Sequence, residues 1–282
     1  MDLALSDKVV LVTGASGGIG SAMAEAFAAE GARLVLHAGS RLAELERWIA
    51  AQPWSSRALA LEAEISDCAS VERLFAAARA HFGRVDVVIA NAGRWTSEFA
   101  LVHQASEARI RANLETNLFG SLWTARAFLA TLAATGPRAD GHGASLVLIG
   151  STAGRFGEKG HAEYAVSKAG LYGILTSIKN EIVALDPFGR VNLIEPGWTV
   201  TRMARHSLEE PGVIARVVRT MPLRQLARAE DIARAALFLA SHAAARHVSG
   251  EALTIAGGME GRVQWETREV DEAAVRARLA QA

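Results

Sequence analysis

Tyr164 and Lys168, in the segment HAEYAVSKAG at 161–170, are the residues whose types and spacing first suggest chemistry. A spacing of four places both side chains on one face of a helix. A free phenol titrates near pH 10, and an ammonium about 4 Å away favours its phenolate by up to about 4 kcal/mol at an effective dielectric of 20. The pair therefore predicts a phenol with a lowered pKa, suited to acid–base work near neutral pH. A chance pair on a solvated helix is the alternative.

Ser151 lies thirteen residues before Tyr164, directly after the apolar run SLVLIG. Doubly wound α/β proteins bind their ligands at the carboxyl ends of strands, so this hydroxyl is expected beside the phenol. The chain has 26 Arg but only four Lys, so a plain solvated cation at 168 would more often be Arg. An ammonium is a compact point charge that can serve two partners, whereas a guanidinium has a different shape.

The segment TGASGGIG at 13–20 lies between the first expected strand and the first expected helix, where a glycine pattern predicts a phosphate site. Gly14 permits a tight turn, while Gly18 and Gly20 let the backbone approach a pyrophosphate and let the helix pack on the sheet. Free N–H groups at the helix N-terminus can then bind the anion. A glycine-rich connector without a ligand is the alternative.

The elements that must position these residues alternate along the chain. Short apolar runs predict seven strands, at 8–12, 33–37, 58–65, 85–91, 145–150, 190–197 and 251–258. Helical periodicity predicts helices at 19–29, 41–51, 70–82 (capped by Ser70), 106–134, 163–185 and 229–241. This alternation predicts an α/β fold, a single doubly wound domain with a seven-stranded parallel sheet and helices on both faces. The loop at 135–143 is expected away from the chemistry.

Composition bounds the function further. The chain has 282 residues, half of them apolar, and equal numbers of basic and acidic residues, 30 each. The balance gives no electrostatic case for nucleic acid or an anionic membrane, so a small-molecule substrate is expected. Cys68 is alone, which favours a reducing compartment, and the N-terminus lacks the features of a signal peptide. We expect a soluble cytoplasmic protein, and the excess of Ala and Arg suggests a bacterial genome.

Four motifs in this order carry a resemblance: TG-x3-G-x-G, NAG at 91–93, Tyr-x3-Lys, and PG at 196–197. Together they resemble the short-chain dehydrogenase/reductase family over residues 6 to about 258. The resemblance implies a Rossmann-type dinucleotide-binding and catalytic domain over 1–258. Residues 198–228 are expected to form a substrate lid, and 259–282 a C-terminal tail that crosses a subunit interface, covers a neighbouring pocket, or stays solvated.

The resemblance also implies roles for four residues. Tyr164 is the acid/base toward the substrate oxygen, and Ser151 donates a hydrogen bond to that oxygen. Lys168 lowers the pKa of the phenol and holds the nicotinamide ribose. Asn117, in LETNLFG, matches a family residue that anchors a water chain to the lysine, although a structural Asn on a helix is the alternative.

The segment after the second strand bears on the nicotinamide cofactor. Ala38 stands where family members that choose NAD usually carry an acidic residue, and Ser40 and Arg41 could bind a 2′-phosphate. NADP(H) is therefore favoured over NAD(H), unless Arg41 merely begins a solvated helix. The residues expected to bind the cofactor are Gly14, Ser16, Gly18, Ile19, Gly20, Ser40, Arg41, Glu64, Ile65, Asn91, Ala92, Gly93, Tyr164, Lys168, Pro196, Gly197, Thr199 and Thr201. The Pro–Gly pair could equally be turn chemistry.

Loop position suggests the substrate contacts. The substrate is expected to meet Trp95, Ala153, Phe156, His161 and Trp198, with Arg94, Thr96 and Met203 nearby. Aromatic residues in such loops could instead pack a lid, and His161 could be incidental. The eight His form no metal-spaced cluster, so no metal is predicted.

These features predict an NAD(P)-dependent oxidoreductase that interconverts a secondary alcohol and a ketone. The alternatives are a 3-oxoacyl thioester reductase and a non-catalytic NADP(H)-binding sensor or scaffold. A double-bond reductase of the enoyl type is disfavoured, because related enzymes space the tyrosine and lysine wider. The resemblance implies a homodimer or homotetramer.

Overall fold

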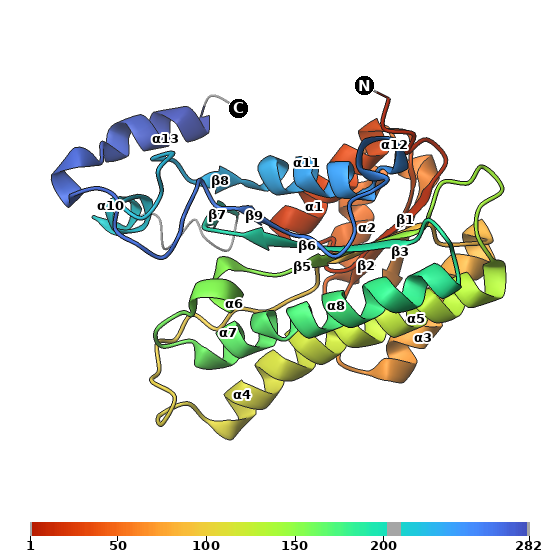
Figure 1. The fold of residues 1–282 in the computed structure, drawn as a ribbon, viewed down its shortest axis with the longest axis horizontal. Coiled ribbons are helices and arrows are strands. Elements are labelled where there is room, and N and C mark those ends of the chain that lie inside the picture. Colours follow the sequence, from red (N-terminus) through yellow and green to blue (C-terminus); the bar gives the residue numbers. More distant parts are fainter. Residues whose placement is uncertain (1, 202–209, 281–282) are drawn as a thin grey trace.

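The computed structural model describes residues 2–201 and 210–280. One parallel sheet dominates this described part, with the strand order β3-β2-β1-β4-β5-β6-β9 (Figure 1). Its strands are β1 (Val9–Val12), β2 (Arg33–Ala38), β3 (Ala58–Glu62), β4 (Val87–Ala90), β5 (Ser145–Ile149), β6 (Arg190–Pro196) and β9 (Ala252–Ile255). The chain winds outward in both directions from the neighbours β1 and β4. The predicted doubly wound fold is thereby confirmed, and a ligand crevice is expected where the winding reverses.

Helices cover both faces of the sheet (Figure 1). They are α1 (Gly18–Ala29), α2 (Leu42–Ala50), α3 (Cys68–Phe82), α4 (Glu107–Asn113), α5 (Gly120–Thr135), α6 (Thr152–Phe156), α7 (Ala162–Ala169), α8 (Leu171–Glu181), α10 (Val213–Val218), α11 (Ala229–Ala240), α12 (His242–Ala245) and α13 (Glu272–Ala280). The described residues also form short helical turns, namely η1 (Ser55–Arg57), the π-helical η2 (Leu114–Phe119), η3 (Ile182–Ala184) and η4 (Thr267–Glu269).

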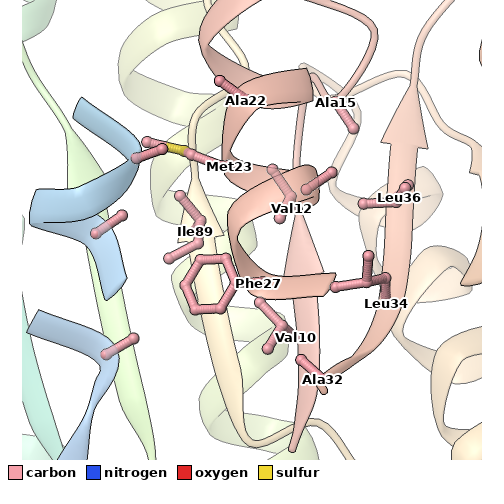
Figure 2. Packing of buried hydrophobic residues seen from close by; sticks show 14 of the residues in the cluster. Val10, Val12, Ala15, Ala22, Met23, Phe27, Ala32, Leu34, Leu36 and Ile89 are labelled. Atoms are coloured by element: carbon pink, nitrogen blue, oxygen red, sulfur yellow. The ribbon is translucent and has the colours of Figure 1, made fainter. Parts of the chain in front are cut away.

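The sheet buries a separate apolar core on each face. Alternate β1 residues point to opposite faces of the sheet. Val10 packs with Met23 and Phe27 of α1 (Figure 2), while Leu11 belongs to the core on the face covered by α3, α5 and α8. Each of these side chains is fully buried. Because both faces are covered, the strands read as continuous apolar runs rather than as alternating patterns.

Three local predictions differ from the structure. Asp67, not Ser70, caps α3, and its carboxylate accepts hydrogen bonds from the backbone N–H groups of Ala69 and Ser70 at 3.1 Å. The Ser70 hydroxyl instead accepts from the N–H of Glu64 at 3.0 Å. The long helix expected at 106–134 contains the π-helical turn η2, and the helix expected at 163–185 divides into α7, α8 and η3 at Gly170.

The segments 198–228 and 259–280 share a third apolar core, leaving aside residues 202–209, which lie outside the described part. α10 contributes Val213 and Val218, and α13 contributes Val275, which is 1% exposed. The indole N–H of Trp265 donates to the carbonyl of Met221 at 2.9 Å. The tail is therefore packed on segment 198–228 of its own chain rather than fully solvated. The short strands β7 (Thr199–Val200) and β8 (Ala227–Arg228) pair at the two ends of that segment.

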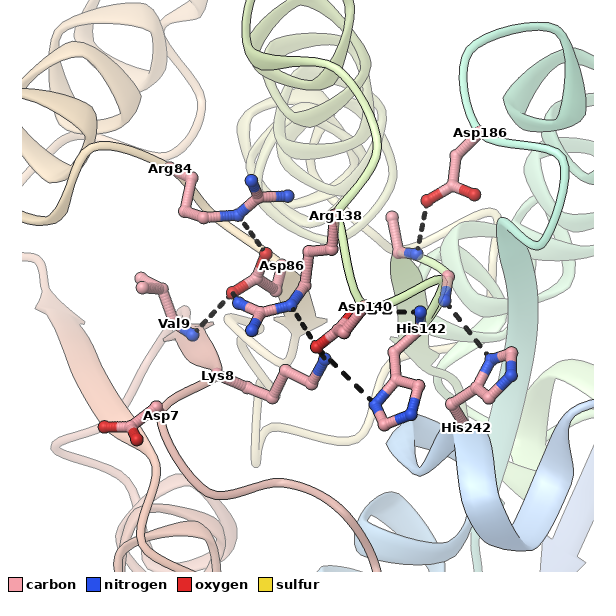
Figure 3. Close-up of polar contacts among 12 residues, drawn as sticks. Asp7, Lys8, Val9, Arg84, Asp86, Arg138, Asp140, His142, Asp186 and His242 are labelled. Atoms are coloured by element: carbon pink, nitrogen blue, oxygen red, sulfur yellow. Dashed lines mark hydrogen bonds and ion pairs between the residues drawn. The ribbon is translucent and has the colours of Figure 1, made fainter.

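A charged network closes the amino edge of the sheet (Figure 3). Asp86, 2% exposed, accepts hydrogen bonds from the N–H of Val9 at 2.9 Å and from Arg138 at 3.0 Å, and also pairs with Arg84. Asp140 in the loop at 135–143 binds the Lys8 ammonium at 2.9 Å. Burial alone would raise the pKa of the Asp140 carboxyl, but hydrogen bonds from Lys8, His142 and Arg138 hold that pKa well below its usual value. The loop lies at the opposite edge from Ser151, as expected.

Replacing Asp86 tests how much this network stabilises the fold. Asp86→Asn removes the carboxylate from a buried site, leaves Arg84 without its ion-pair partner and leaves Arg138 with Asp140 alone, so we expect unfolding free energy to fall by about 3 kcal/mol. The matched control is Glu107→Gln, because Glu107 and Arg111 form an exposed pair worth about 0.5 kcal/mol or less. Urea denaturation followed by circular dichroism measures both, and equal losses would contradict the assignment.

Candidate active site

A cavity of about 750 Å³ lies at the carboxyl ends of the strands, on both sides of the β1–β4 junction. Every residue that the sequence assigned to the cofactor lines it: Gly14, Ser16, Gly18, Ile19, Gly20, Ser40, Arg41, Glu64, Ile65, Asn91, Ala92, Gly93, Tyr164, Lys168, Pro196, Gly197, Thr199 and Thr201. Residues without an assigned role also line it, notably His37, Thr116, Glu158 and Met259.

The glycine turn is packed so closely that side chains are excluded. Gly14 has φ of +68°, and a Cβ atom there would lie 2.9 Å from the Cα of Ala92. A Cβ atom on Gly20 would lie 2.3 Å from the carbonyl oxygen of Gly14. α1 begins directly after this turn, and no side chain caps its N-terminus. Backbone N–H groups therefore face the cavity, which is the arrangement that binds a pyrophosphate.

Side chains from neighbouring strands hold this turn in place. The Asn91 amide donates to the carbonyl oxygens of Thr13 at 2.9 Å and Gly14 at 3.2 Å. The Thr13 hydroxyl accepts from the N–H groups of Asn91 and Ala92, both at 2.9 Å. These four bonds join the ends of β1 and β4 across the switch point. Asn91 therefore holds the glycine turn in place and also lines the cavity.

His37, which the sequence analysis did not single out, supports the turn from β2. Its Nδ1 accepts from the N–H of Gly14 at 3.1 Å, so its Nε2 carries the proton and donates to the carbonyl oxygen of Ala63 at 3.0 Å. Burial lowers the pKa of His37, so the ring stays neutral at physiological pH. A lone polar ring inside an otherwise apolar strand was the signal that could have identified it.

Tyr164 and Ser151 meet at the wall of the cavity. Ser151 follows β5 and caps α6, where its Oγ accepts from the N–H of Ala153 at 3.1 Å. Tyr164 lies on α7, half-buried, and its phenol is hydrogen-bonded with Ser151. Lys168 lies one turn further along α7 and is 5% exposed. Its ammonium donates to the carbonyl oxygen of Ile149 at 2.8 Å and sits 6.0 Å from the centre of the Tyr164 ring.

The pKa of the phenol shifts in the direction opposite to the prediction. Burial raises the pKa of Tyr164, the hydrogen bond with Ser151 lowers it, and the charge of Glu158 raises it, with a net increase. Burial also lowers the pKa of Lys168 to about 8. The expected lowering of the phenol pKa by the ammonium was wrong, because desolvation is the larger effect for both groups.

Asn117 lies in the π-helical turn η2 and is fully buried behind the cavity. Its amide accepts from the N–H of Arg94 at 2.8 Å and donates to the Arg94 carbonyl and to the Ser167 hydroxyl, both at 3.1 Å. A Cβ atom on Gly93 would lie 3.2 Å from the Asn117 Oδ1 and 3.4 Å from the Lys168 ammonium. The glycine keeps the space between these two groups open.

Three of the five predicted substrate residues line the cavity, namely Trp95, Ala153 and Trp198, as does Arg94. Phe156, His161 and Thr96 do not line it, and Met203 lies outside the described residues. The His161 ring instead stacks on Trp95, with centroids 4.1 Å apart. Trp95 in turn meets the Tyr164 ring edge-on at 4.7 Å. His161 is thus a support for Trp95.

A buried ion pair fixes this aromatic group. Arg109 of α4 donates to the Glu163 carboxylate at 2.7 Å, and the two side chains are 7% and 3% exposed. The same guanidinium donates to the carbonyl of Gly160 at 2.9 Å and to Nδ1 of His161 at 3.3 Å. Burial, and then the charge of Arg109, lower the pKa of His161. The network connects α4 to the start of α7, one residue before Tyr164.

A doubly wound sheet whose glycine turn and Ser–Tyr–Lys group share one cavity defines an α/β nucleotide-binding protein equipped for proton transfer. A family model described as Enoyl-(Acyl carrier protein) reductase matches residues 14–260. The chain belongs to the short-chain dehydrogenase/reductase family of oxidoreductases. Among the described residues, no helix is long and apolar enough to span a membrane.

Individual relatives cover almost the whole chain. It is 34% identical over 254 residues to the 3-oxoacyl-[acyl-carrier-protein] reductase FabG of Escherichia coli, covering 89% of this chain and 97% of the relative. It is 34% identical over 260 residues to the L-rhamnose 1-dehydrogenase (NAD(P)(+)) of Azotobacter vinelandii, covering 90% and 97%. A solved short-chain dehydrogenase/reductase described as a glucose/ribitol dehydrogenase, from Brucella melitensis, superposes with a TM-score of 0.81 at 28% identity, covering 92% of this chain and 98% of that one.

Gly20→Ala tests the packing of the cofactor turn. The new methyl group would overlap the carbonyl of Gly14, so the turn must move, and we expect nicotinamide nucleotide to bind at least tenfold more weakly, about 1.4 kcal/mol. Gly173→Ala on α8 is the matched control, because its Cβ meets open space and a helical alanine stabilises by about 0.5–1 kcal/mol. Isothermal titration with the nucleotide measures binding, and unchanged affinity in Gly20→Ala would contradict the role of the turn.

Proposed function

We propose that this chain is an NADP(H)-dependent oxidoreductase that interconverts a secondary alcohol and a ketone, with Tyr164 as the acid/base. Family membership gives the coarser statement, an oxidoreductase that uses a nicotinamide cofactor and acts on a small molecule. The observation that carries the proposal is the meeting of Ser151, Tyr164 and Lys168 in the wall of the cavity that the glycine turn also lines.

The residues present fit a nicotinamide nucleotide. The close-packed glycines leave the N-terminus of α1 open to a pyrophosphate, and Lys168, which lines the same cavity, would donate to a ribose hydroxyl. When bound, the nicotinamide exchanges a hydride with the carbinol or carbonyl carbon of the substrate. The hydroxyl of Ser151 donates to the substrate oxygen and stabilises negative charge that develops there.

Tyr164 moves the proton at that same oxygen. Its raised pKa keeps the phenol protonated at neutral pH, which is the form that donates a proton to a ketone oxygen as the bond order falls. Lys168, with a pKa of about 8, is mostly protonated at pH 7 and stabilises the phenolate left behind. At neutral pH the phenol of Tyr164 is protonated and the amine of Lys168 is mostly protonated, and these states favour reduction of a ketone.

The choice of NADP(H) rests on the end of β2. Ala38 is the last strand residue, and Ser40 and Arg41, both exposed, line the adjoining part of the cavity. Arg41 has no ion pair with any described residue. The Glu64 carboxylate on the other side accepts from the N–H of Ser66 at 3.1 Å and from its hydroxyl at 2.7 Å. The Arg41 guanidinium, which has no ion pair among the described residues, can bind a 2′-phosphate. The Glu64 carboxylate is already hydrogen-bonded within its own turn, which also favours the phosphate.

Three other functions are less well supported. A 3-oxoacyl thioester reductase would use the same three residues, and several relatives carry that description. Reduction of a double bond, the activity in the description of the family model, fits less well because Tyr164 and Lys168 are only four residues apart. A sensor or scaffold would need no Ser–Tyr–Lys group, so retention of all three favours turnover.

Tyr164→Phe distinguishes an enzyme from a sensor. Without the phenolic proton we expect kcat/KM for ketone reduction to fall by about 10²–10⁴-fold. NADPH affinity should stay within about threefold, since the ring itself is retained. Absorbance at 340 nm measures turnover and fluorescence titration measures binding. Full turnover in this variant would rule out the proposed acid/base.

Arg41→Ala tests the cofactor preference. Loss of a charge-assisted bond to the 2′-phosphate, about 1.5–3 kcal/mol, should weaken NADPH binding by about ten- to a hundredfold and leave NADH binding unchanged. Arg47→Ala is the control, because Arg47 lies on α2, the helix that Arg41 precedes, but does not line the cavity. Equal weakening of both nucleotides would argue against a 2′-phosphate site.

A further inference from the structure

A carboxylate stands at the substrate end of the cavity and has no part in the proposed chemistry. Glu158 lies in the short loop between α6 and α7 and lines the cavity together with Trp95, Trp198 and Met259. Its charge acts on the phenol of Tyr164. Glu158 therefore lies near the phenol, among the cavity-lining residues to which no cofactor contact is assigned.

The backbone on either side of Glu158 is held firmly. Gly157 and Gly160, with φ of +79° and +84°, form turns on both sides of it. The Glu158 carbonyl accepts from the N–H of His161 at 3.1 Å, and the Gly160 carbonyl accepts from the N–H of Ala100 at 3.2 Å and from Arg109 at 2.9 Å. The ion pair between Arg109 and Glu163 thus anchors this loop as well as α7. These hydrogen bonds hold the backbone that carries the Glu158 carboxylate in one conformation.

Two guanidinium groups flank the same region. Arg94 lines the cavity beside Trp95, and Arg216 of α10 lies close enough to act on Glu158. Burial raises the pKa of Glu158 and the charge of Arg216 lowers it. Within the described residues, Glu158 has no cation within 4 Å. Its oxygens are therefore available to a ligand, while the nearby guanidinium groups disfavour a cationic one.

We infer that Glu158 is a specificity-determining residue that accepts a hydrogen bond from a substrate hydroxyl next to the reacting carbon. The substrate class that fits is an uncharged, hydroxyl-rich alcohol, such as a polyol or an aldose. Carboxylate and guanidinium groups supply acceptors and donors for several hydroxyls, and the faces of Trp95 and Trp198 supply apolar contact. This inference rests on the proposed function and names the substrate of the same site.

The same features disfavour an acyl thioester. A fixed carboxylate beside the reacting carbon would have to lie against an apolar chain, without a hydrogen-bond donor. Two similar proteins act by description on hydroxyl-rich substrates, the L-rhamnose 1-dehydrogenase and the glucose/ribitol dehydrogenase. The relatives described as 3-oxoacyl reductases are equally similar in sequence, so Glu158 rather than overall identity carries the distinction.

The test compares Glu158→Leu with wild type on four probes: ribitol, L-rhamnose, cyclohexanol and 3-oxobutyryl coenzyme A, each with NADP(H) at the pH optimum of each variant. Wild type should prefer ribitol or L-rhamnose. Glu158→Leu should lose about ten- to a hundredfold in kcat/KM on that probe, mainly through KM, and change less than threefold on cyclohexanol. Lys159→Leu is the control, because Lys159 is the adjacent residue, is exposed as Glu158 is, and does not line the cavity.

Glu158→Gln tests separately, through the pH profile, whether the carboxylate acts on the phenol of Tyr164. The phenol of Tyr164 is hydrogen-bonded with Ser151, the charge of Glu158 acts on it, and the Lys168 ammonium lies 6.0 Å from its ring centre. Removing the one negative charge favours the phenolate, so the acid limb of the pH profile for alcohol oxidation should move to lower pH. An unmoved limb would show that the carboxylate does not face the phenol.

Other outcomes overturn the inference without touching the proposed function. Preference of wild type for the thioester, absence of turnover on both hydroxyl-rich probes, or an equal loss on cyclohexanol in Glu158→Leu would each reject it. A preference for an amino alcohol, added as a fifth probe, would do the same. The proposed function fails separately, if Tyr164→Phe keeps full turnover on whichever probe is reduced or oxidised.

Discussion

The ammonium of Lys168 donates to the carbonyl oxygen of Ile149 at 2.8 Å, and the arrangement of the site depends on this contact. It ties α7 to the last residue of β5, two residues before Ser151. The distance between the serine hydroxyl and the phenol is therefore set by one strand end. A buried ammonium destabilises the fold at neutral pH, as its pKa of about 8 records. The position is retained at a cost in stability, which is the expected signature of a residue placed for chemistry.

Desolvation governs the acid–base pair more strongly than the attraction between its members. Spacing along a helix predicts that Tyr164 and Lys168 are neighbours, but it contains no information on burial. It also cannot reveal Glu158, whose effect on the phenol depends on how the loop after α6 folds back toward the cavity. Tyr164 and Lys168 do line one cavity, as their spacing suggested, but the predicted direction of the phenol pKa shift was wrong.

The parts of the fold that could be predicted are those fixed by local pattern. The strands follow from apolar runs, and the cofactor turn follows from glycines that have no room for a side chain. The errors arose where two neighbouring residues compete for one role, as Asp67 and Ser70 do at the start of α3, or where a partner is distant in sequence. His37 and Gly14 are 23 residues apart, and Arg109 and Glu163 are 54 apart. Trp95 and His161 were both assigned to the substrate, yet only contact between their rings shows that one supports the other.

The third core, in which α10 and α13 pack together, shares no residue with the cores on the two faces of the sheet. Met259 and Trp198, which pack against this core, also line the cavity. Mutations inside this small core can therefore reshape the acceptance of substrates while the nucleotide turn and the sheet keep their packing. Such a division allows a lineage to diversify what it oxidises or reduces without rebuilding how it holds its coenzyme.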